Sequence, residues 1–157
     1  MRHDTALNST LREMTKTIYA FVLSLTIIAC GPNKQQVDKG KEQIDIVCDS
    51  VMQTFTNGNY SKAFDILKQN TVMSTSAIDT LKVATATYAT NAFPTYGKMR
   101  SYEFVSEHKI KNTIAKRFYL LKFDNYYLKF EFTLYNNGER WTITTFAYDE
   151  SLLELLY

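Results

Sequence analysis

Four side chains have the types and spacing to form a small proton-transfer site. Tyr102, Ser106 and His108 occupy alternating positions of one segment, so they are expected on the same face of a β-strand. Tyr119, from the following segment, is expected to point into the same space. An imidazole can act as a general base near neutral pH. No acid or nucleophile accompanies His108 in the pattern, so the favoured interpretation is a histidine at the rim of a sheet, hydrogen-bonded to a neighbour or to water.

Other catalytic and cofactor-binding patterns are weak or missing in the sequence. Glu103, Glu107 and Glu131 have the parity opposite to that of His108 and are expected on a solvated face, which argues against the paired carboxylates of glycosidases. Cys48 lies on the apolar side of a helical pattern and is expected to be a buried, unreactive thiol. The chain has only two His and two Cys residues, too few in their spacing for a metal-ligand set, and its five glycines form no phosphate-binding loop. We therefore expect neither a metal nor a cofactor.

Composition and charge narrow the class of protein further. The 18 Lys and Arg side chains nearly match the 16 Asp and Glu side chains, for a formal net charge of +2. The basic residues are also spread singly along the chain, without the basic stripe that binding to nucleic acid requires. We therefore expect no nucleic-acid partner. A chain of 157 residues, 45% of them hydrophobic, is expected to form one domain.

The N-terminal residues have the pattern of an export signal. Residues 18–29 form an uncharged, apolar run behind Lys16 that is too short to span a bilayer. The run leads into IIACG (residues 27–31), which resembles the lipobox of bacterial lipoproteins. The resemblance implies cleavage before Cys30 and a diacylglycerol on the Cys30 sulfur. We therefore expect an exported protein that is anchored to a bacterial envelope membrane through Cys30, with its domain in the periplasm.

Three boundaries follow from this interpretation. Residues 1–29 are the expected signal peptide, and residues 30–41, rich in Gln, Gly, Pro and charges, are expected to form a flexible tether. Residues 42–157 are then the single domain. Asp4 and Glu13 would weaken the positive head of the signal, so translation is expected to begin at Met14.

The first half of the domain has the periodicity of three helices. Apolar residues recur every three or four positions from Glu42, from Asn59 and from Ser76. Asn57-Gly58 is a typical helix end, and Asn59 is a candidate N-cap for the second helix. Ser76 and Asp79 resemble a capping box at the start of the third.

From Tyr102 onward the apolar period changes to two, which predicts β-strands. Four strands with short, turn-rich breaks predict an antiparallel meander over residues 102–110, 115–123, 126–135 and 141–148. Four alternating residues of the third strand are expected to face the helices: Leu128, Phe130, Phe132 and Leu134. In the fourth strand Trp141 and Phe146 have opposite parity, which predicts a bulge near Thr144-Thr145 and a bent sheet with a concave side.

This order of elements resembles a known fold. The carrying motifs are Phe55-x-x-Gly58-Asn59-Tyr60-x-x-Ala63-Phe64, Tyr96-Gly97 and Trp141-x-Ile143. The chain resembles, over about residues 42–150, the cystatin-like α+β roll of nuclear transport factor two-like and ketosteroid isomerase-like proteins, and more closely small bacterial lipoproteins with such a domain. The resemblance implies three helices packed on a curved four-stranded antiparallel sheet. That superfamily contains isomerases, dehydratases and many non-catalytic domains, so the resemblance alone assigns no function.

The second strand is apolar on both faces, which suggests an interaction surface. If Leu121 faces the helices, then Phe118 and Leu120 lie on the convex face of the sheet, near Tyr127 and Tyr135. Such an apolar, tyrosine-rich patch predicts a homodimer or a complex with a protein partner.

The function favoured by the sequence is a non-catalytic, membrane-anchored module that binds a small molecule or a protein. One alternative is a small enzyme of the isomerase or dehydratase kind, with His108 as the base in a concave pocket. Another is a domain for structural self-association.

Overall fold

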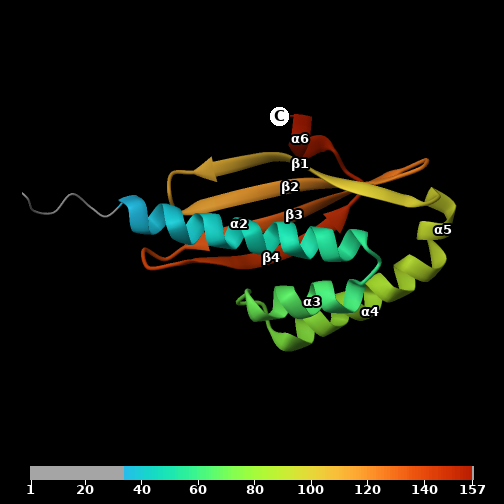
Figure 1. Cartoon of the computed structure of the whole chain (residues 1–157), viewed down its shortest axis with the longest axis horizontal. Coiled ribbons are helices and arrows are strands. Elements are labelled where there is room, and N and C mark those ends of the chain that lie inside the picture. Colours follow the sequence, from blue (N-terminus) through green and yellow to red (C-terminus); the bar gives the residue numbers. More distant parts are fainter. Residues whose placement is uncertain (1–33, 157) are drawn as a thin grey trace, which may run out of the picture. The chain divides into compact units, whose positions relative to one another are not determined.

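The domain consists of helices that precede an antiparallel sheet, with one short helix after it (Figure 1). A computed structural model describes residues 34–156; the expected signal peptide, Met14 and Cys30 lie outside these residues. The elements are α2 (Lys34–Thr56), α3 (Tyr60–Gln69), α4 (Thr75–Asn91), α5 (Phe93–Tyr96), β1 (Met99–Ile110), β2 (Ile114–Phe123), β3 (Tyr127–Asn136), β4 (Trp141–Asp149) and α6 (Leu153–Leu156). The predicted α+β class and the order of helices before strands are confirmed.

Helix α2 begins earlier than the sequence predicts. It starts at Lys34 instead of Glu42, so residues 34–41 are helical although we predicted them to be part of a flexible tether. Tertiary contacts account for the extension, because most helical stability in proteins comes from packing and not from propensity. The position of a Cβ on Gly40 lies 3.9 Å from the Trp141 ring, and the Lys41 amine reaches Glu107 on the sheet.

The next two helices begin at polar caps. Asn59 caps α3 as predicted, and its side chain accepts a hydrogen bond from the Lys62 amide at 3.4 Å. The cap of α4 is Ser74 and not Ser76; its hydroxyl oxygen accepts from the Ala77 amide at 3.2 Å. Either serine satisfies an otherwise unpaired amide at the first turn.

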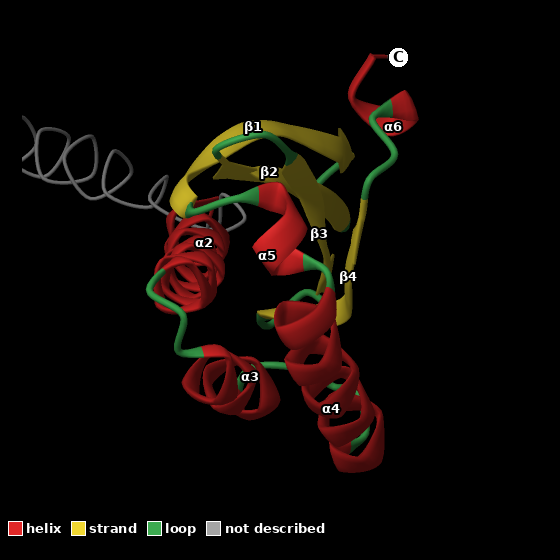
Figure 2. Ribbon diagram, turned by 90° about the vertical axis from the view of Figure 1, so that its right-hand side faces the viewer, coloured by secondary structure: helices red, strands yellow, loops and turns green. Residues whose placement is uncertain are grey.

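The four strands form the predicted meander in the order β1-β2-β3-β4, and every neighbouring pair is antiparallel. The sheet curves around α2, α3 and α4, while α6 lies on its other side (Figure 2). The predicted inward face of β3 is confirmed, because Leu128, Phe130, Phe132 and Leu134 are all buried in the core. Aromatic rings fill the space between helices and sheet; Phe55 of α2 lies 4.9 Å from Phe130, centroid to centroid.

Both outer strands are bulged: β1 has two register shifts, at Met99–Ser101 and at Phe104–Ser106, and β4 has one, which is the bulge that the sequence predicts. In the β3–β4 pairing, Thr133 lies opposite Thr145 and the next β3 residue, Leu134, lies opposite Ile143. Thr144 has no partner in β3 and is therefore the extra residue of the bulge. This confirms the predicted bulge and brings Trp141 and Phe146 into the same core. In the β1–β2 pairing, Phe104 lies opposite Tyr119 and Ser106 lies opposite Phe118, the neighbour of Tyr119, so one residue of β1 between them has no partner. A bulge of this kind reverses the face of every residue that follows it.

Candidate functional site

The β1 bulge separates the four predicted pocket residues. Tyr102 faces the helices, and its ring centroid lies 6.1 Å from that of Tyr119. Ser106 and His108 follow the bulge and pair with Phe118 and Lys116 on the opposite face. His108 is exposed there, with its ring 5.3 Å from the Phe118 ring. The predicted inward face of His108 is therefore wrong, because strict alternation was assumed through a bulged strand.

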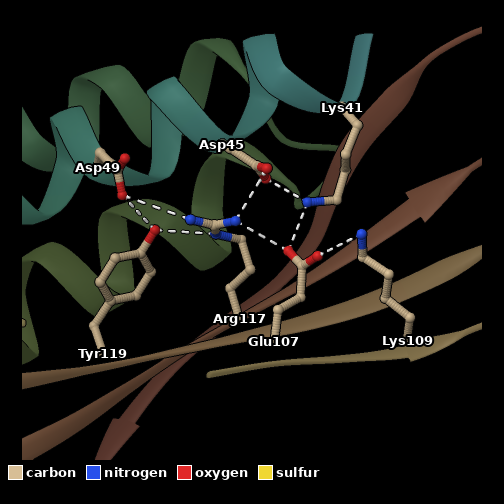
Figure 3. Close-up of polar contacts among 7 residues, drawn as sticks. All are labelled: Lys41, Asp45, Asp49, Glu107, Lys109, Arg117 and Tyr119. Carbon is tan, nitrogen blue, oxygen red and sulfur yellow. Dashed lines mark hydrogen bonds and ion pairs between the residues drawn. The ribbon is translucent and has the colours of Figure 1, made fainter. Parts of the chain in front are cut away.

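The same bulge turns Glu107 inward, where it joins a network of charges between α2 and the sheet (Figure 3). We predicted Glu107 on a solvated face, and this placement is wrong for the same reason. The Glu107 side chain is 12% exposed. We call this set the α2–sheet network; its members are Lys41, Asp45, Asp49, Glu107, Lys109, Arg117 and Tyr119.

Arg117 is the centre of the α2–sheet network. Its guanidinium contacts carboxylate oxygens of Asp45 and Glu107, each at 3.0 Å. Its Nε donates a hydrogen bond to the Tyr119 hydroxyl at 3.0 Å, and that hydroxyl donates to Asp49 at 2.6 Å. Arg117 is buried, so these partners replace the water that its charge has lost.

Lysines complete the charge balance of the network. Lys41 contacts Glu107 at 2.6 Å and also Asp45 within its own helix, and Lys109 contacts Glu107 at 2.9 Å. The three cations Lys41, Lys109 and Arg117 thus match three carboxylates. Since each charge has a partner of opposite sign, the network can hold α2 on the sheet without a bound ion.

Burial and the charges around the α2–sheet network move the pKa values of Cys48, Tyr119 and Glu107 further from neutral pH. Burial raises the pKa of the Cys48 thiol to about 12, although the charge of Arg117 opposes this. Burial and the hydrogen bond to Asp49 raise the pKa of Tyr119. Burial alone would raise the pKa of Glu107, but hydrogen bonds and charges from Lys41, Lys109 and Arg117 hold it below its ordinary value. The thiol and the phenol stay protonated and the carboxylate stays ionised at neutral pH.

Tyrosines gather around a second carboxylate, at the end of β4. The hydroxyls of Tyr96, Tyr88 and Tyr126 donate to the Glu150 carboxylate at 2.8–2.9 Å. These hydrogen bonds lower the pKa of Glu150. The Tyr126 ring is stacked on Tyr96, with centroids 4.4 Å apart. The carboxylate thus ties the chain after β4 to α4 and α5.

The described domain has several depressions, and two of them border the sheet. One, of about 210 Å³, is lined by Tyr60, Ala89, Phe93, Pro94, Gly97, Met99 and Phe123. The other, of about 170 Å³, has a mostly polar lining of Ile44, Gln69, Asn70, Thr71, Val72, Arg140, Trp141 and Thr142. We call the second one the β4 groove, because Arg140, Trp141 and Thr142 lie at the start of that strand.

The predicted interface residues lie on the convex face as expected, but they differ in exposure. Phe118 is only 1% exposed, so the prediction that it is open to a partner is wrong. Lys129 lies on the same face, 2% exposed, with its amine 6.0 Å from the centre of the Phe118 ring. Leu120 and Tyr127 are half-buried, whereas Tyr135 is exposed.

Sequence patterns missed most of these polar residues. The spacing of Lys41, Asp45 and Asp49, four residues apart, places them on one helix face and is the signal that could have been used. The sequence predicts that the helix begins at Glu42, so Lys41 falls outside the predicted helix face. Arg117, Arg140 and Glu150 carried no distinguishing pattern.

The described residues contain no group of His, Cys, Asp and Glu side chains that could hold a metal ion. Over the same part of the chain, no helix is long and apolar enough to cross a membrane. Comparison with protein-family models finds no match, and comparisons with curated proteins and with solved structures find no significant one. The function must therefore be argued from the residues themselves.

Proposed function

We propose that this chain is an exported bacterial lipoprotein whose domain binds a small molecule without changing it chemically. The apolar run of residues 18–29 and the lipobox-like sequence before Cys30 support the export and the anchor. The helix order and the curved meander support a cystatin-like roll of the nuclear transport factor two-like kind. The depressions that border the sheet are the places where such a ligand could bind.

The pairing within the α2–sheet network is the observation that carries the non-catalytic interpretation. A general base must have a lone pair free to take a proton from a substrate. Glu107 and Asp45 instead share Arg117 and Lys41. His108 lies exposed on the opposite face, where no carboxylate among the described residues contacts it. These side chains support a structural role.

Expression of the full chain in a bacterium that processes lipoproteins tests the anchor. We expect a mature protein that begins at Cys30, carries the mass of a diacylglycerol and sediments with the membrane. Cys30→Ala should remove the lipid and leave the domain folded, because the core cluster of the described domain begins at Ile44. Cys48→Ala is the control and should keep the lipid. A Cys30→Ala protein with unchanged mass and unchanged fractionation would contradict the proposal.

Binding is tested on the mature protein by thermal unfolding with panels of small carboxylates, amides, amines and sugars. A ligand that binds only the folded state raises the Tm, and the rise grows with the logarithm of the ligand concentration once that concentration exceeds the Kd. We expect at least one panel to raise the Tm and mass spectrometry to recover its ligand unchanged. No rise with any panel, or recovery of a converted product, would count against this function.

A further inference from the structure

The β4 groove contains hydrogen-bond donors that the fold leaves unused. Some of its polar groups hold the backbone: the Asn70 amide donates to Ile66, and the Thr71 hydroxyl donates to the Ile143 carbonyl, each at 2.8 Å. Others have no side-chain hydrogen bond to the described side chains and backbone of residues 40–155, namely those of Gln69, Arg140, Trp141 and Thr142. Asn70 and Thr71 therefore stabilise the fold, whereas the polar groups of the second set are free to bind a ligand.

Arg140 differs from the other arginines of the described domain. Arg117 is surrounded by carboxylates and Arg100 contacts Asp124, whereas Arg140 forms no ion pair with the described side chains of residues 40–155. No acidic side chain is among the described residues that line the groove. An exposed guanidinium without a carboxylate presents a planar set of donors that matches a carboxylate in two-point contact.

Trp141 provides a second unsatisfied donor in the same place. The residue is 6% exposed, and its indole Nε1 is buried without an acceptor in the structure. Buried polar groups in native proteins nearly always have a partner, and residues 40–155 supply no acceptor for this indole N–H. A ligand oxygen bound at Arg140 would provide that acceptor.

The size and the remaining lining restrict the ligand. A volume of about 170 Å³ is below the range of drug-sized sites, so it suits a small molecule. Ile44 and Val72 add apolar surface beside the polar donors. The groove therefore fits a short carboxylate with a branched or otherwise compact apolar body.

We propose that the β4 groove binds a small carboxylate, with Arg140 pairing with its oxygens, the Trp141 indole donating to one of them, and Ile44 and Val72 contacting its apolar part. This inference rests on the proposed binding function and names the ligand class and the residues for it. One member of the α2–sheet network adjoins the groove, because the Lys41 amine lies 5.6 Å from the centre of the Trp141 ring.

The single tryptophan of the chain makes the test direct, because intrinsic tryptophan fluorescence comes from Trp141 alone. The mature full-length protein in detergent is titrated with isobutyrate, with the neutral analogue isobutyramide, and with inorganic phosphate. We expect isobutyrate to change the emission saturably and isobutyramide to have little effect. Phosphate that binds as tightly as isobutyrate would identify a general anion site and overturn the carboxylate assignment.

Variants of Arg140 test the assigned contact. Arg140→Met should weaken isobutyrate binding at least about tenfold, because a hydrogen-bonded ion pair is lost. Arg140→Lys, which keeps the charge but not the two-point geometry, should fall between Arg140→Met and the wild type. Arg100→Met is the matched control, with the same change at an exposed arginine of β1, and should bind as the wild type does. Equal affinity in Arg140→Met and wild type would overturn the assignment.

Calorimetry on the same samples separates this inference from the function on which it rests. If Arg140→Met still gives a heat of isobutyrate binding, without a change in Trp141 emission, the ligand binds elsewhere. The proposed binding function would then hold, and the groove assignment would not. Binding by amines or sugars but not by carboxylates would also refute the groove assignment alone. Absence of binding by every panel would refute both.

Discussion

A buried ion network is stable only while each charge keeps its partner. In this domain Glu107 contacts Lys41, Lys109 and Arg117, and it lies nearly out of solvent. Removing a partner from such a group leaves the remaining charges desolvated and uncompensated. The energetic importance of Glu107 therefore comes from the residues around it and not from its own exposure to a ligand.

The acid sensitivity of the domain should depend on Glu107. Its pKa is held below the ordinary value of 4.5 in the folded state. A depressed pKa stabilises the fold at pH values above that of the unfolded chain, and the contribution is lost as the pH falls through the folded value. We expect the free energy of unfolding to fall between about pH 5 and pH 3, with a smaller fall in Glu107→Gln.

At neutral pH Glu107→Gln should lose roughly 1 to 3 kcal/mol, the range for a buried hydrogen-bond partner. Glu139→Gln, at an exposed residue without an ion pair in residues 34–156, is the control and should change little. Urea unfolding at several pH values measures both effects. An acid dependence that Glu107→Gln leaves unaltered would show that other carboxylates control it.

The inward aromatic residues of β3 should dominate the stability of the core. Phe130 and Phe132 are fully buried, and Phe132 lies 5.1 Å from Phe146. Truncation of either to Ala should cost about 3 to 5 kcal/mol, because a cavity remains where the ring was. Phe104→Ala, at a partly exposed ring on the edge strand, should cost less than about 1 kcal/mol. Chemical denaturation that ranks Phe104 above both would show that the two β3 rings do not dominate the stability of the core.

At the scale of elements, bulges in the two outer strands decide which side chains face the helices. The β4 bulge at Thr144 could be predicted, because Trp141 and Phe146 are both large, apolar and of opposite parity. The β1 bulge between Phe104 and Ser106 could not, since both parities there carry polar residues and no Gly or Pro interrupts the strand. Only an alternation of apolar and polar residues indicates which face of a strand is buried, and this part of β1 lacks one.

The link between α5 and β1 depends on Gly97. Its φ of 85° and ψ of −162° belong to a region that almost only glycine adopts. A Cβ at this position would lie 2.7 Å from the Asp124 Cβ, next to the β2–β3 turn. Backbone strain and steric overlap therefore act together at one residue.

Gly97→Ala should destabilise the domain by more than the roughly 1 to 2 kcal/mol expected for a left-handed backbone alone. Gly138→Ala is the matched control, because Gly138 also has a positive φ of 95° but nothing within 4 Å of a new Cβ. Thermal and urea unfolding of the two variants measures the difference. Equal losses would mean that Asp124 moves aside without cost.

At the scale of the whole domain, the chain covers part of its own convex face. Glu154 of α6 contacts Lys129 at 3.3 Å and Lys116 at 3.7 Å. Figure 2 places α6 on the side of the sheet away from α2, α3 and α4. Phe118 is buried on this face, so the surface left for a partner is smaller than the sequence suggests and is centred on Leu120, Tyr127 and Tyr135.

The homodimer predicted on this face is tested by two single variants. Leu120→Lys should dissociate the mature protein without lowering its Tm much, because Leu120 is only half-buried. Phe118→Glu should instead unfold the domain, because it places a charge in a buried site. Light scattering and thermal unfolding distinguish the two outcomes. A monomeric wild type would remove the homodimer from consideration.

The sequence by itself determined the features that depend on consecutive residues. The apolar period predicted the helices, the strands, the meander and the inward face of β3, because periodicity records which side of each element is buried. The tertiary structure alone decided where β1 reverses its faces, which charges meet and what covers Phe118. Lys41 and Glu107 are 66 residues apart, and Asp49 and Tyr119 are 70 apart. Such contacts arise from the docking of distant elements, which no local pattern encodes.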